Sequence, residues 1–362
     1  MADARHRRIT AVRERLVELH LDGLLVSSLP NVRYLTGFSG SNALLLVTSR
    51  DLLLLTDFRY ESQVAAEVGD LARIRIELSS LWAGFWEALR GADGLNAVGF
   101  ESAHLMHRDF QRLLEEGDRW AWRPTVDVIE GLRERKDAGE VAAIRRAATV
   151  AQVALESTLR EVRVGLSERQ VAGLLERNLR EAGADDFPFP TIVAAGERSA
   201  LPHARAGSRA IALGDLLLLD FGAICDGYCA DITRTVVMGT ASERQREVHQ
   251  AVREANRTAR EGVRAGLRGK DADAIARELL AARGFGEAFG HGLGHGLGLE
   301  VHEAPRLSRV SESVLPEGAV VTIEPGVYLP GWGGVRIEDD VHLGADGPEV
   351  LTDFPRELLE LA

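Results

Sequence analysis

The segment from Leu216 to Asp231 reads LLLLDFGAICDGYCAD and places two carboxylates on either side of a tight turn. Its Asp226-Gly227 pair is a strong signal for a two-residue β-hairpin. If those residues form the turn, Gly222 lies opposite Asp231. Asp220 then shares their face, because side chains alternate along a strand and cross-strand partners point the same way. We therefore expect Asp220 and Asp231 to lie diagonally across one hairpin, roughly 7 Å apart at the backbone.

A second pair of acidic residues repeats this arrangement further along the chain. Glu324 and Glu338 each lie seven residues from Gly331, which is inside the turn-like run PGWGG. In a regular hairpin centred there, the two glutamates face each other. A single acidic residue in a strand is usually an exposed charge or half of an ion pair. Four in two apolar hairpins instead indicate a cation between them, because carboxylates this close would otherwise repel.

The segments before each hairpin also follow one order. Ser167, with Gln170 three residues on, is a capping box that begins a helix, and Asp271 is expected to cap the corresponding helix of the second half. From Ser167 to Asp220 is 53 residues, and from Asp271 to Glu324 is again 53. We infer two related halves, each made of helices followed by a carboxylate-bearing hairpin. Longer helices are expected to begin the two halves, at residues 137–162 and 242–262.

Histidines and glycines alternate in the segment GHGLGHG at residues 290–296, and His302 follows it closely. Glycine allows close backbone approach and unusual torsion angles. A phosphate-binding loop is not supported, because the Lys and the Ser or Thr of that motif are missing. A single histidine in such a loop is more often structural than a ligand. His291 and His295 together, with His302 nearby, favour a functional site.

The combined set of side chains suggests the kind of metal centre. Four carboxylates and one imidazole exceed the three protein ligands usual at a catalytic zinc ion. They suit two metal ions roughly 3.5–4 Å apart that share bridging carboxylates. Oxygen-rich coordination favours manganese, although zinc or cobalt would also bind. The sequence thus predicts two divalent metal ions per chain.

The first third of the chain alternates short apolar strands with helical stretches, a pattern typical of an α/β domain with a mostly covered sheet. No G-x-G-x-x-G follows the first strand, so a dinucleotide site is not supported. Pro124 and the polar run at 133–139 suggest a boundary between an α/β domain at 1–128 and a catalytic domain at 129–362. Strands are expected at 23–27, 43–48, 52–56, 72–78 and 97–100, and helices at 7–19, 61–68, 82–89 and 108–116.

The composition of the 362 residues narrows the class of protein. A net charge of −12 disfavours a nucleic-acid partner, which would require an excess of Lys and Arg. Cys225 and Cys229 are too few for a disulfide framework or a zinc site, so we expect two reduced side chains in the hairpin. No stretch reads as a membrane span or a signal peptide, and we therefore expect a cytoplasmic protein.

Together these motifs resemble the proline-specific branch of the pita-bread metallopeptidases, namely prolidase and aminopeptidase P. The resemblance covers the chain, since PNVRYLTG at 30–37 and TDFRY at 56–60 are similar to the creatinase-type N-terminal domain of that branch. It implies an α+β fold, with a pita-bread catalytic domain of two pseudo-symmetric halves after a smaller α/β domain. The catalytic motifs are matched by DFG at 220–222, DITRT at 231–235, HGLGH at 291–295, VHE at 301–303, EPG at 324–326 and RIED at 336–339.

The resemblance also assigns roles to individual residues. The implied metal ligands are Asp220, Asp231, His295, Glu324 and Glu338. Glu324 would in addition act as the general base beside a water shared by the metals and pass the proton to the leaving proline nitrogen. The resemblance further implies a homodimer.

Five other residues are expected to handle the substrate. His203 would hydrogen-bond the substrate or the developing oxyanion, while His291 and His302 would line the proline subsite and help in proton transfer. Arg336 would support the neighbouring Glu338 or contact substrate. Arg306 matches an arginine that touches substrate in some prolidases, although a solvated surface arginine is an equally good interpretation.

Three functions are compatible with these residues. The first is a prolidase, which takes only Xaa-Pro dipeptides, and the run VHEAPR at 301–306 favours it. The second is an aminopeptidase P, which removes the residue before proline from longer peptides. The third is a non-catalytic relative that binds a metal or a partner, and the complete ligand set disfavours it. We expect hydrolysis of Xaa-Pro dipeptides, with a proline-containing peptide as the partner.

Overall fold

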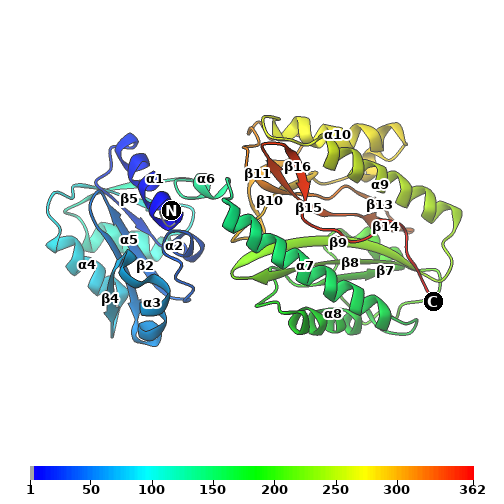
Figure 1. The fold of residues 1–362 in the computed structure, drawn as a ribbon, viewed down its shortest axis with the longest axis horizontal. Coiled ribbons are helices and arrows are strands. Elements are labelled where there is room, and N and C mark those ends of the chain that lie inside the picture. The colour runs from blue at the N-terminus through cyan, green and yellow to red at the C-terminus, as the bar shows by residue number, and fades with distance from the viewer. Residues whose placement is uncertain (1–3) are drawn as a thin grey trace. The chain divides into compact units, whose positions relative to one another are not determined.

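The computed structural model describes residues 4–362, which form two compact units that divide between Arg133 and Glu134. The N-terminal unit is built on one six-stranded sheet of order β4-β3-β2-β1-β5-β6 (Figure 1). Its strands are β1 (Gly23–Val26), β2 (Ala43–Thr48), β3 (Leu52–Asp57), β4 (Arg73–Glu77), β5 (Ala97–Glu101) and β6 (Ala121–Thr125). Its helices are α1 (Ala4–Glu18), α2 (Leu29–Thr36), α3 (Glu61–Val68), α4 (Leu81–Gly91), α5 (His107–Glu116) and α6 (Glu130–Arg133).

Helices cover this sheet, as the alternating pattern predicts. Phe85 and Trp86 of α4 and Leu113 of α5 join one buried cluster with strand residues such as Leu25 and Leu53. Helices α1 and α2 pack against β2. The expected strands and helices are present, but α2, β6 and the short α6 were not predicted. Helix α2 and strand β6 contain proline, which is tolerated in the first turn of a helix and in an edge strand.

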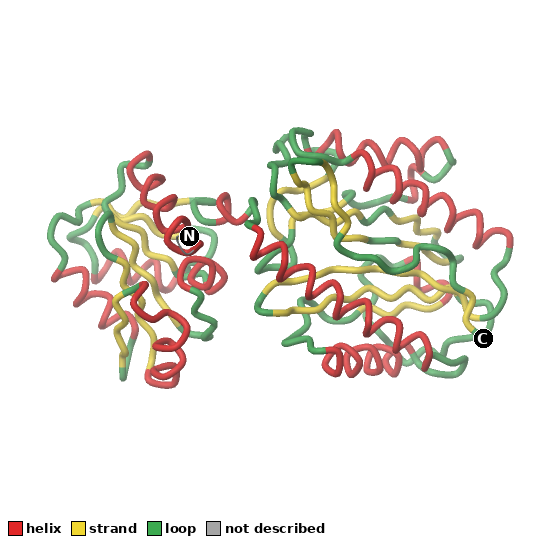
Figure 2. The backbone as a smooth tube through the Cα atoms, viewed as in Figure 1, coloured by secondary structure: helices red, strands yellow, loops and turns green. Residues whose placement is uncertain are grey.

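The C-terminal unit combines four long helices with three sheets (Figure 2). The helices are α7 (Ala138–Glu161), α8 (Glu168–Ala182), α9 (Glu243–Gly262) and α10 (Gly269–Ala282). One sheet has the order β17-β9-β8-β7, with β7 (Ile192–Ala195), β8 (Leu216–Cys225), β9 (Tyr228–Met238) and β17 (Glu360–Leu361). Another has the order β11-β10-β12-β15-β16, with β10 (Gly294–Gly296), β11 (Glu303–Leu307), β12 (Val320–Ile323), β15 (Asp339–Gly344) and β16 (Gly347–Val350). The third pairs β13 (Gly326–Leu329) with β14 (Gly333–Arg336), and short 3₁₀ helices lie at Phe58–Tyr60, Gly69–Leu71, Gly196–Ala200 and Gly286–Ala288.

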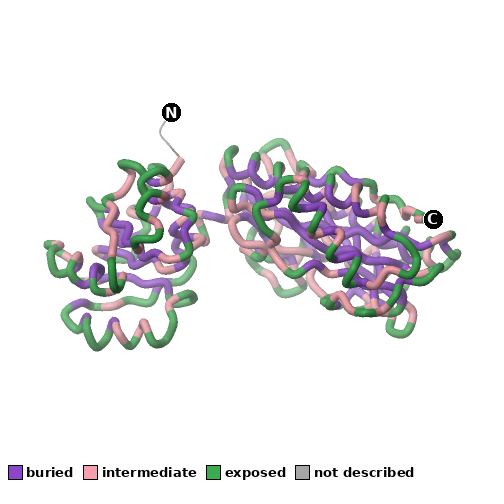
Figure 3. The backbone as a smooth tube through the Cα atoms, turned by 90° about the horizontal axis from the view of Figure 1, so that it is seen from below, coloured by how far each residue is buried: buried purple, intermediate pink, exposed green. Residues whose placement is uncertain are grey.

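Two separate cores confirm that this unit consists of two similarly built halves. Helices α7 and α8 pack on β7, β8 and β9 around residues such as Leu155, Leu175 and Phe221. Helices α9 and α10 pack on strands of the second half around residues such as Val252 and Ile323. The central strands are the most deeply buried backbone of the unit (Figure 3). Polar side chains that point inward from these strands are therefore shielded from water.

The first hairpin has the predicted register. Strands β8 and β9 are antiparallel, with Cys225 opposite Tyr228 and Gly222 opposite Asp231. Asp226 and Gly227 form the turn with φ angles of 51° and 78°, as a type I′ turn requires. Both cysteines are free and buried. Cys225 and Cys229 are one pair out of step across the hairpin, so their side chains leave it on opposite faces.

The second hairpin is shorter than the first. Gly326 pairs with Arg336, and continuing that register by two positions sets Glu324 opposite Glu338. Neither glutamate lies within the ladder, because β12 ends at Ile323 and β15 begins only at Asp339. The sequence therefore predicted the alignment of the two glutamates correctly, but not the breaks in the strands that carry them.

The predicted helix starts are correct in three of four places. Asp137, Ser167 and Ser242 each cap a helix through a capping box. The cap predicted at Asp271 is wrong, because α10 begins two residues earlier, at Gly269. Backbone carbonyls of Ser313 and Ser311 accept the N–H groups of Gly269 and Lys270. A distant segment thus satisfies the helix terminus, and no side-chain cap is needed.

No helix within residues 4–362 combines the length and the apolar character that a bilayer crossing requires.

Candidate metal centre

The ten residues that the sequence identified as site candidates line one cavity of about 980 Å³ in the C-terminal unit. They come from β8, β9, the loop before β8, the segment around β10 and β11, and the ends of β12 and β14. The candidates on its wall are His203, Asp220, Asp231, His291, His295, His302, Arg306, Glu324, Arg336 and Glu338. Segments separated by more than a hundred positions in the sequence thus meet at one place.

Three of the candidates approach one another with the geometry of a metal site. Ligand atoms of Asp231, His295 and Glu338 all lie within 4.8 Å of one another. His295 Nε2 lies 3.5 Å from Glu324 Oε1 and 3.9 Å from Asp231 Oδ2. His295 Nδ1 donates to the Gly296 carbonyl at 3.1 Å, so Nε2 carries the free lone pair of the neutral ring. Burial keeps that ring neutral by lowering its pKa to about 4.

The carboxylates carry more negative charge than the surrounding chain neutralises. Burial and mutual repulsion raise the pKa of Asp231 and Glu338 well above their ordinary values. Burial likewise raises the pKa of Glu324 to about 8. Asp231 Oδ1 is buried without a hydrogen-bond partner, which is costly for a carboxylate oxygen. A divalent cation would satisfy that atom and offset the repulsion, so this set of oxygen and nitrogen donors fits metal ions.

Asp220 lies in the same group but has a cationic partner. Arg336 is 3% exposed and donates from Nη2 to Asp220 Oδ2. Its other nitrogens donate to the Tyr328 hydroxyl at 2.7 Å and to Thr233 Oγ1 at 3.0 Å. Thr233 Oγ1 in turn donates to Glu338 Oε2. Arg336 is thus occupied in orienting two acidic side chains, as expected of a supporting residue rather than a substrate contact.

His291 is also held by the protein on both sides of its ring. Nδ1 donates to the Gly292 carbonyl at 2.8 Å, so Nε2 accepts the hydroxyl of Tyr328 at 2.8 Å. Burial lowers the pKa of His291 to about 4, consistent with this neutral form. Its Nδ1 lies 3.9 Å from Glu324 Oε2. His291 therefore borders the acidic cluster, with both ring nitrogens engaged within the chain.

Three other candidates present their side chains to the cavity without a partner. Within residues 4–362, no hydrogen bond or ion pair engages the side chains of His203, His302 or Arg306, and all three are exposed. The rings of His302 and His295 lie 4.3 Å apart. Arg306 pairs with His295 across β10 and β11, so both side chains leave the sheet on one face. These three side chains are available to a bound molecule.

Some residues of the site were not recognised from the sequence. Tyr328 joins His291 to Arg336, and Thr233 joins Arg336 to Glu338. Asp340 is buried and accepts the N–H of Asp231 at 3.1 Å. The sequence did offer a signal for Asp340, since it is the third of three consecutive acidic residues that begin at Glu338. Thr233 gave none, because its partners lie more than a hundred positions away. Tyr328 lies eight residues from Arg336 in the same hairpin, so the register of that hairpin was a signal for this contact.

Comparison with known protein families gives two matches that together span most of the chain. Residues 142–345 match metallopeptidase family M24. Residues 8–135 match the creatinase/prolidase N-terminal domain. The expected fold, a pita-bread catalytic unit preceded by a smaller α/β creatinase-type unit, is confirmed.

Individual relatives match over nearly their full length. The Xaa-Pro dipeptidase of Pyrococcus horikoshii is 37% identical, over 99% of this chain and 100% of the relative. The solved structure of an Xaa-Pro dipeptidase from Bacillus anthracis has a TM-score of 0.95 and 38% identity, covering 99% of this chain and 100% of that one. An X-Pro aminopeptidase from Thermotoga maritima has a TM-score of 0.88 and 36% identity, covering 97% and 99%. Similar chains thus include both dipeptidases and aminopeptidases.

Proposed function

This chain belongs to metallopeptidase family M24 and is a peptidase, and from that premise we propose that it hydrolyses the Xaa-Pro bond of dipeptides with two divalent metal ions. The observation that carries the proposal is that Asp220, Asp231, His295, Glu324 and Glu338 line one cavity, with ligand atoms of three of them within 4.8 Å of one another. Their excess negative charge and the unpaired oxygen of Asp231 support these five as the ligands. Manganese suits so many oxygen donors best.

The proposed chemistry assigns work to the residues around the cluster. Divalent ions held there supply Lewis acidity and lower the pKa of bound water. Glu324, at the edge of the cavity, accepts the proton of the attacking water and delivers it to the proline nitrogen. His203, which has no partner in the described chain, donates to the oxyanion that develops on the scissile carbonyl. His302 contributes to the wall against the proline ring.

Specificity for dipeptides is supported by Arg306. Its guanidinium lines the cavity, shares a face with His295, and pairs with no acidic residue in the part of the chain that the structure describes. A free guanidinium at this position suits the carboxylate that directly follows proline in a dipeptide, because the arginine fork binds carboxylate with two parallel hydrogen bonds. Arg336 is the weaker candidate for this contact, since its donors already serve Asp220, Tyr328 and Thr233.

One observation favours aminopeptidase P as the second candidate. The cavity of about 980 Å³ is at the upper end of the range for small-molecule sites, which is roughly 300–1,000 Å³. It therefore offers more room than a dipeptide fills. A longer peptide would extend past Arg306 instead of ending there.

The deciding assay compares Met-Pro with Met-Pro-Ala on the manganese-loaded protein. The proposal predicts strong hydrolysis of the dipeptide and little of the tripeptide. It also predicts that Arg306→Ala raises KM for Met-Pro by about tenfold, as for the loss of one charge-assisted contact. Comparable release of methionine from both peptides would favour aminopeptidase P. The homodimer stays a prediction, which light scattering of the same sample checks.

A further inference from the structure

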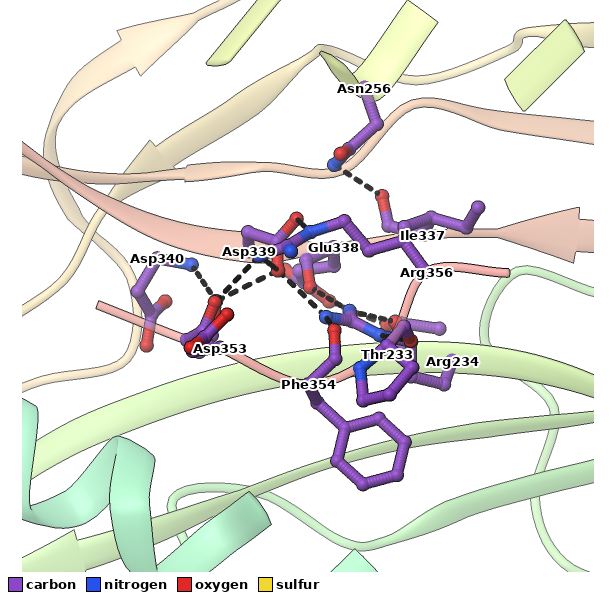
Figure 4. A network of polar contacts seen from close by, with 12 residues as sticks. Thr233, Arg234, Asn256, Ile337, Glu338, Asp339, Asp340, Asp353, Phe354 and Arg356 are labelled. Carbon is purple, nitrogen blue, oxygen red and sulfur yellow. Dashed lines mark hydrogen bonds and ion pairs between the residues drawn. The ribbon is translucent and has the colours of Figure 1, made fainter. Parts of the chain in front are cut away.

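A buried polar cluster adjoins Glu338 of the candidate metal centre (Figure 4). Asp339 follows Glu338 in the chain, is 0% exposed, and is absent from the cavity wall. Three arginines and a threonine surround its carboxylate. The contacts to Asp339 are Arg234 Nη2 at 2.8 Å, Arg356 Nε at 2.8 Å, Thr352 Oγ1 at 2.9 Å and Arg260 Nε at 3.2 Å.

One branch of this cluster, through Arg234, fixes the backbone of Glu338. Glu338 lies in the gap between β14 and β15, where no strand ladder holds it. Its N–H donates to the Thr233 carbonyl at 3.1 Å. Arg234 Nη1 donates to the carbonyls of both Glu338 and Thr233, at 2.6 Å and 2.9 Å. The guanidinium therefore joins the segment of Glu338 to β9, two residues from Asp231.

A second branch runs through Arg260 to Asn256 on α9. Arg260 Nε donates to Asn256 Oδ1 at 2.7 Å, while also facing Asp339. Asn256 Nδ2 donates to the carbonyls of Ile323 and Ile337, at 3.0 Å and 3.2 Å. These carbonyls belong to the residues immediately before Glu324 and Glu338. One side-chain amide thus joins the two backbone segments that carry the glutamates.

We propose that Asp339, acting through Arg234 and Asn256, is the hub of a positioning network that sets the spacing of the metal ligands. The network reaches the backbone of Glu338, of the residue before Glu324 and of Thr233, two residues from Asp231. Asp339, Arg234 and Asn256 are themselves absent from the cavity wall. These three carboxylates repel one another, and two of them lie outside regular strands, so their spacing requires such support. A functional site needs its ligands held within about 0.5 Å of the working geometry.

This inference rests on the proposed function in one respect, namely that these carboxylates bind metal. The test therefore measures metal binding directly, by calorimetric titration of manganese into the metal-stripped full chain. Asn256→Leu removes the amide at similar volume and leaves no buried charge unpaired. Arg234→Lys keeps the charge but cannot bridge both carbonyls. The expected result is a loss of manganese affinity of about 10- to 100-fold in each variant, as for outer partners of metal ligands.

Asn178→Leu is the matched control. Asn178 is 4% exposed and its Nδ2 donates to Thr158 Oγ1 at 3.0 Å, so it is a buried amide of the same unit with no contact to a ligand segment. It should lower the melting temperature of the metal-free chain about as much as Asn256→Leu does, yet leave manganese affinity unchanged.

The outcomes separate the inference from the proposed function. If Asn256→Leu binds manganese with wild-type affinity, the proposed network is wrong, while the metal centre is unaffected. If Arg234→Lys does not fold, Asn256→Leu alone provides the test. An equal loss of affinity in Asn178→Leu would show a general effect of stability and also overturns it. If the wild-type chain takes up no manganese, the proposed function and the network fail together.

Discussion

Glu338 and Asp339 are consecutive and almost completely buried, yet the protein surrounds their charges in opposite ways. Burial alone would raise the pKa of Asp339, but Arg234, Arg356 and Arg260 hold it well below its ordinary value. Glu338 has acidic neighbours instead, and burial together with Glu324 and Asp220 raises its pKa well above its ordinary value.

The difference separates two uses of a buried carboxylate. Burying an ion without a partner costs several kcal/mol, so a folded chain keeps such an arrangement only where something offsets it. At Asp339 the chain supplies three cations of its own. Among residues 4–362, only Arg336 supplies a cation to the acidic group around Glu338, and the remaining charge is left for a bound cation. Asp339 and its arginines hold the backbone in place, whereas Glu338 and its acidic neighbours are available to bind metal.

The largest expected effect comes from removing the charge of Glu338, which lies on the cavity wall. Glu338→Gln should lose metal and lower kcat/KM for Met-Pro by about 10³-fold or more, because Lewis-acid catalysis contributes several kcal/mol. Metal analysis and steady-state kinetics on the same sample check this. Glu349→Gln, at a surface carboxylate of the same unit, should leave both unchanged. Near-normal turnover in Glu338→Gln would remove it from the ligand set.

Removing the charge of Asp339 should lower the free energy of unfolding. Asp339→Asn should lower the free energy of unfolding of the metal-free chain by about 3–5 kcal/mol, because it leaves three guanidiniums without their anion. Urea denaturation measures the change, and Asp353→Asn at an exposed position is the control. A loss below about 1 kcal/mol would mean that solvent or neighbouring carbonyls already satisfy the arginines.

A smaller effect is expected at His203, which is not one of the proposed metal ligands. His203→Ala should keep both metal ions but lower kcat by about 10²-fold, as for the loss of one oxyanion donor. Metal content and kcat together distinguish this from Glu338→Gln, in which both fall. Full activity in His203→Ala would indicate an ordinary loop histidine.

In the absence of metal, the pH dependence of stability should reveal the raised pKa of Glu324 on the cavity wall. Glu324 titrates at about 8 in the folded chain and near 4.5 when unfolded, so between these values the folded state binds more protons. Its contribution to stability is therefore fully present below pH 4.5 and lost as pH rises through 8. The lowered pKa values of His291 and His295 act in the opposite direction, but only up to pH 6.5. The melting temperature of metal-free protein should therefore fall between pH 6.5 and pH 8, and manganese should remove this dependence. A rise over that interval would contradict the assignment.

Local patterns in the sequence were sufficient to predict the frame of the site. The Asp226-Gly227 turn and the alternation of side chains determine where Asp220 and Asp231 lie, and Gly331 determines the alignment of Glu324 with Glu338. These features depend on neighbours within one hairpin, which is why periodicity and turn chemistry reveal them.

The supporting contacts depend on long-range packing and were beyond such patterns. Arg234 meets Glu338 across 104 positions, and Asn256 meets Ile323 across 67. The missing cap of α10 has the same cause, since Ser311 and Ser313 reach its N-terminus from a distant segment. The alignment with Glu324 singles out Glu338, but nothing in the sequence near Asp339 indicates its arginine partners, so only the fold reveals that Asp339 is neutralised.

Two metal ions bound by Glu338 and its acidic neighbours would be visible in the metal content of the active protein. Purified protein is loaded with manganese, dialysed, and analysed for metal by mass spectrometry alongside its activity on Met-Pro. We expect close to two ions per chain in the active wild type and loss of activity when chelation removes them. Full activity with fewer than one ion per chain would contradict this expectation.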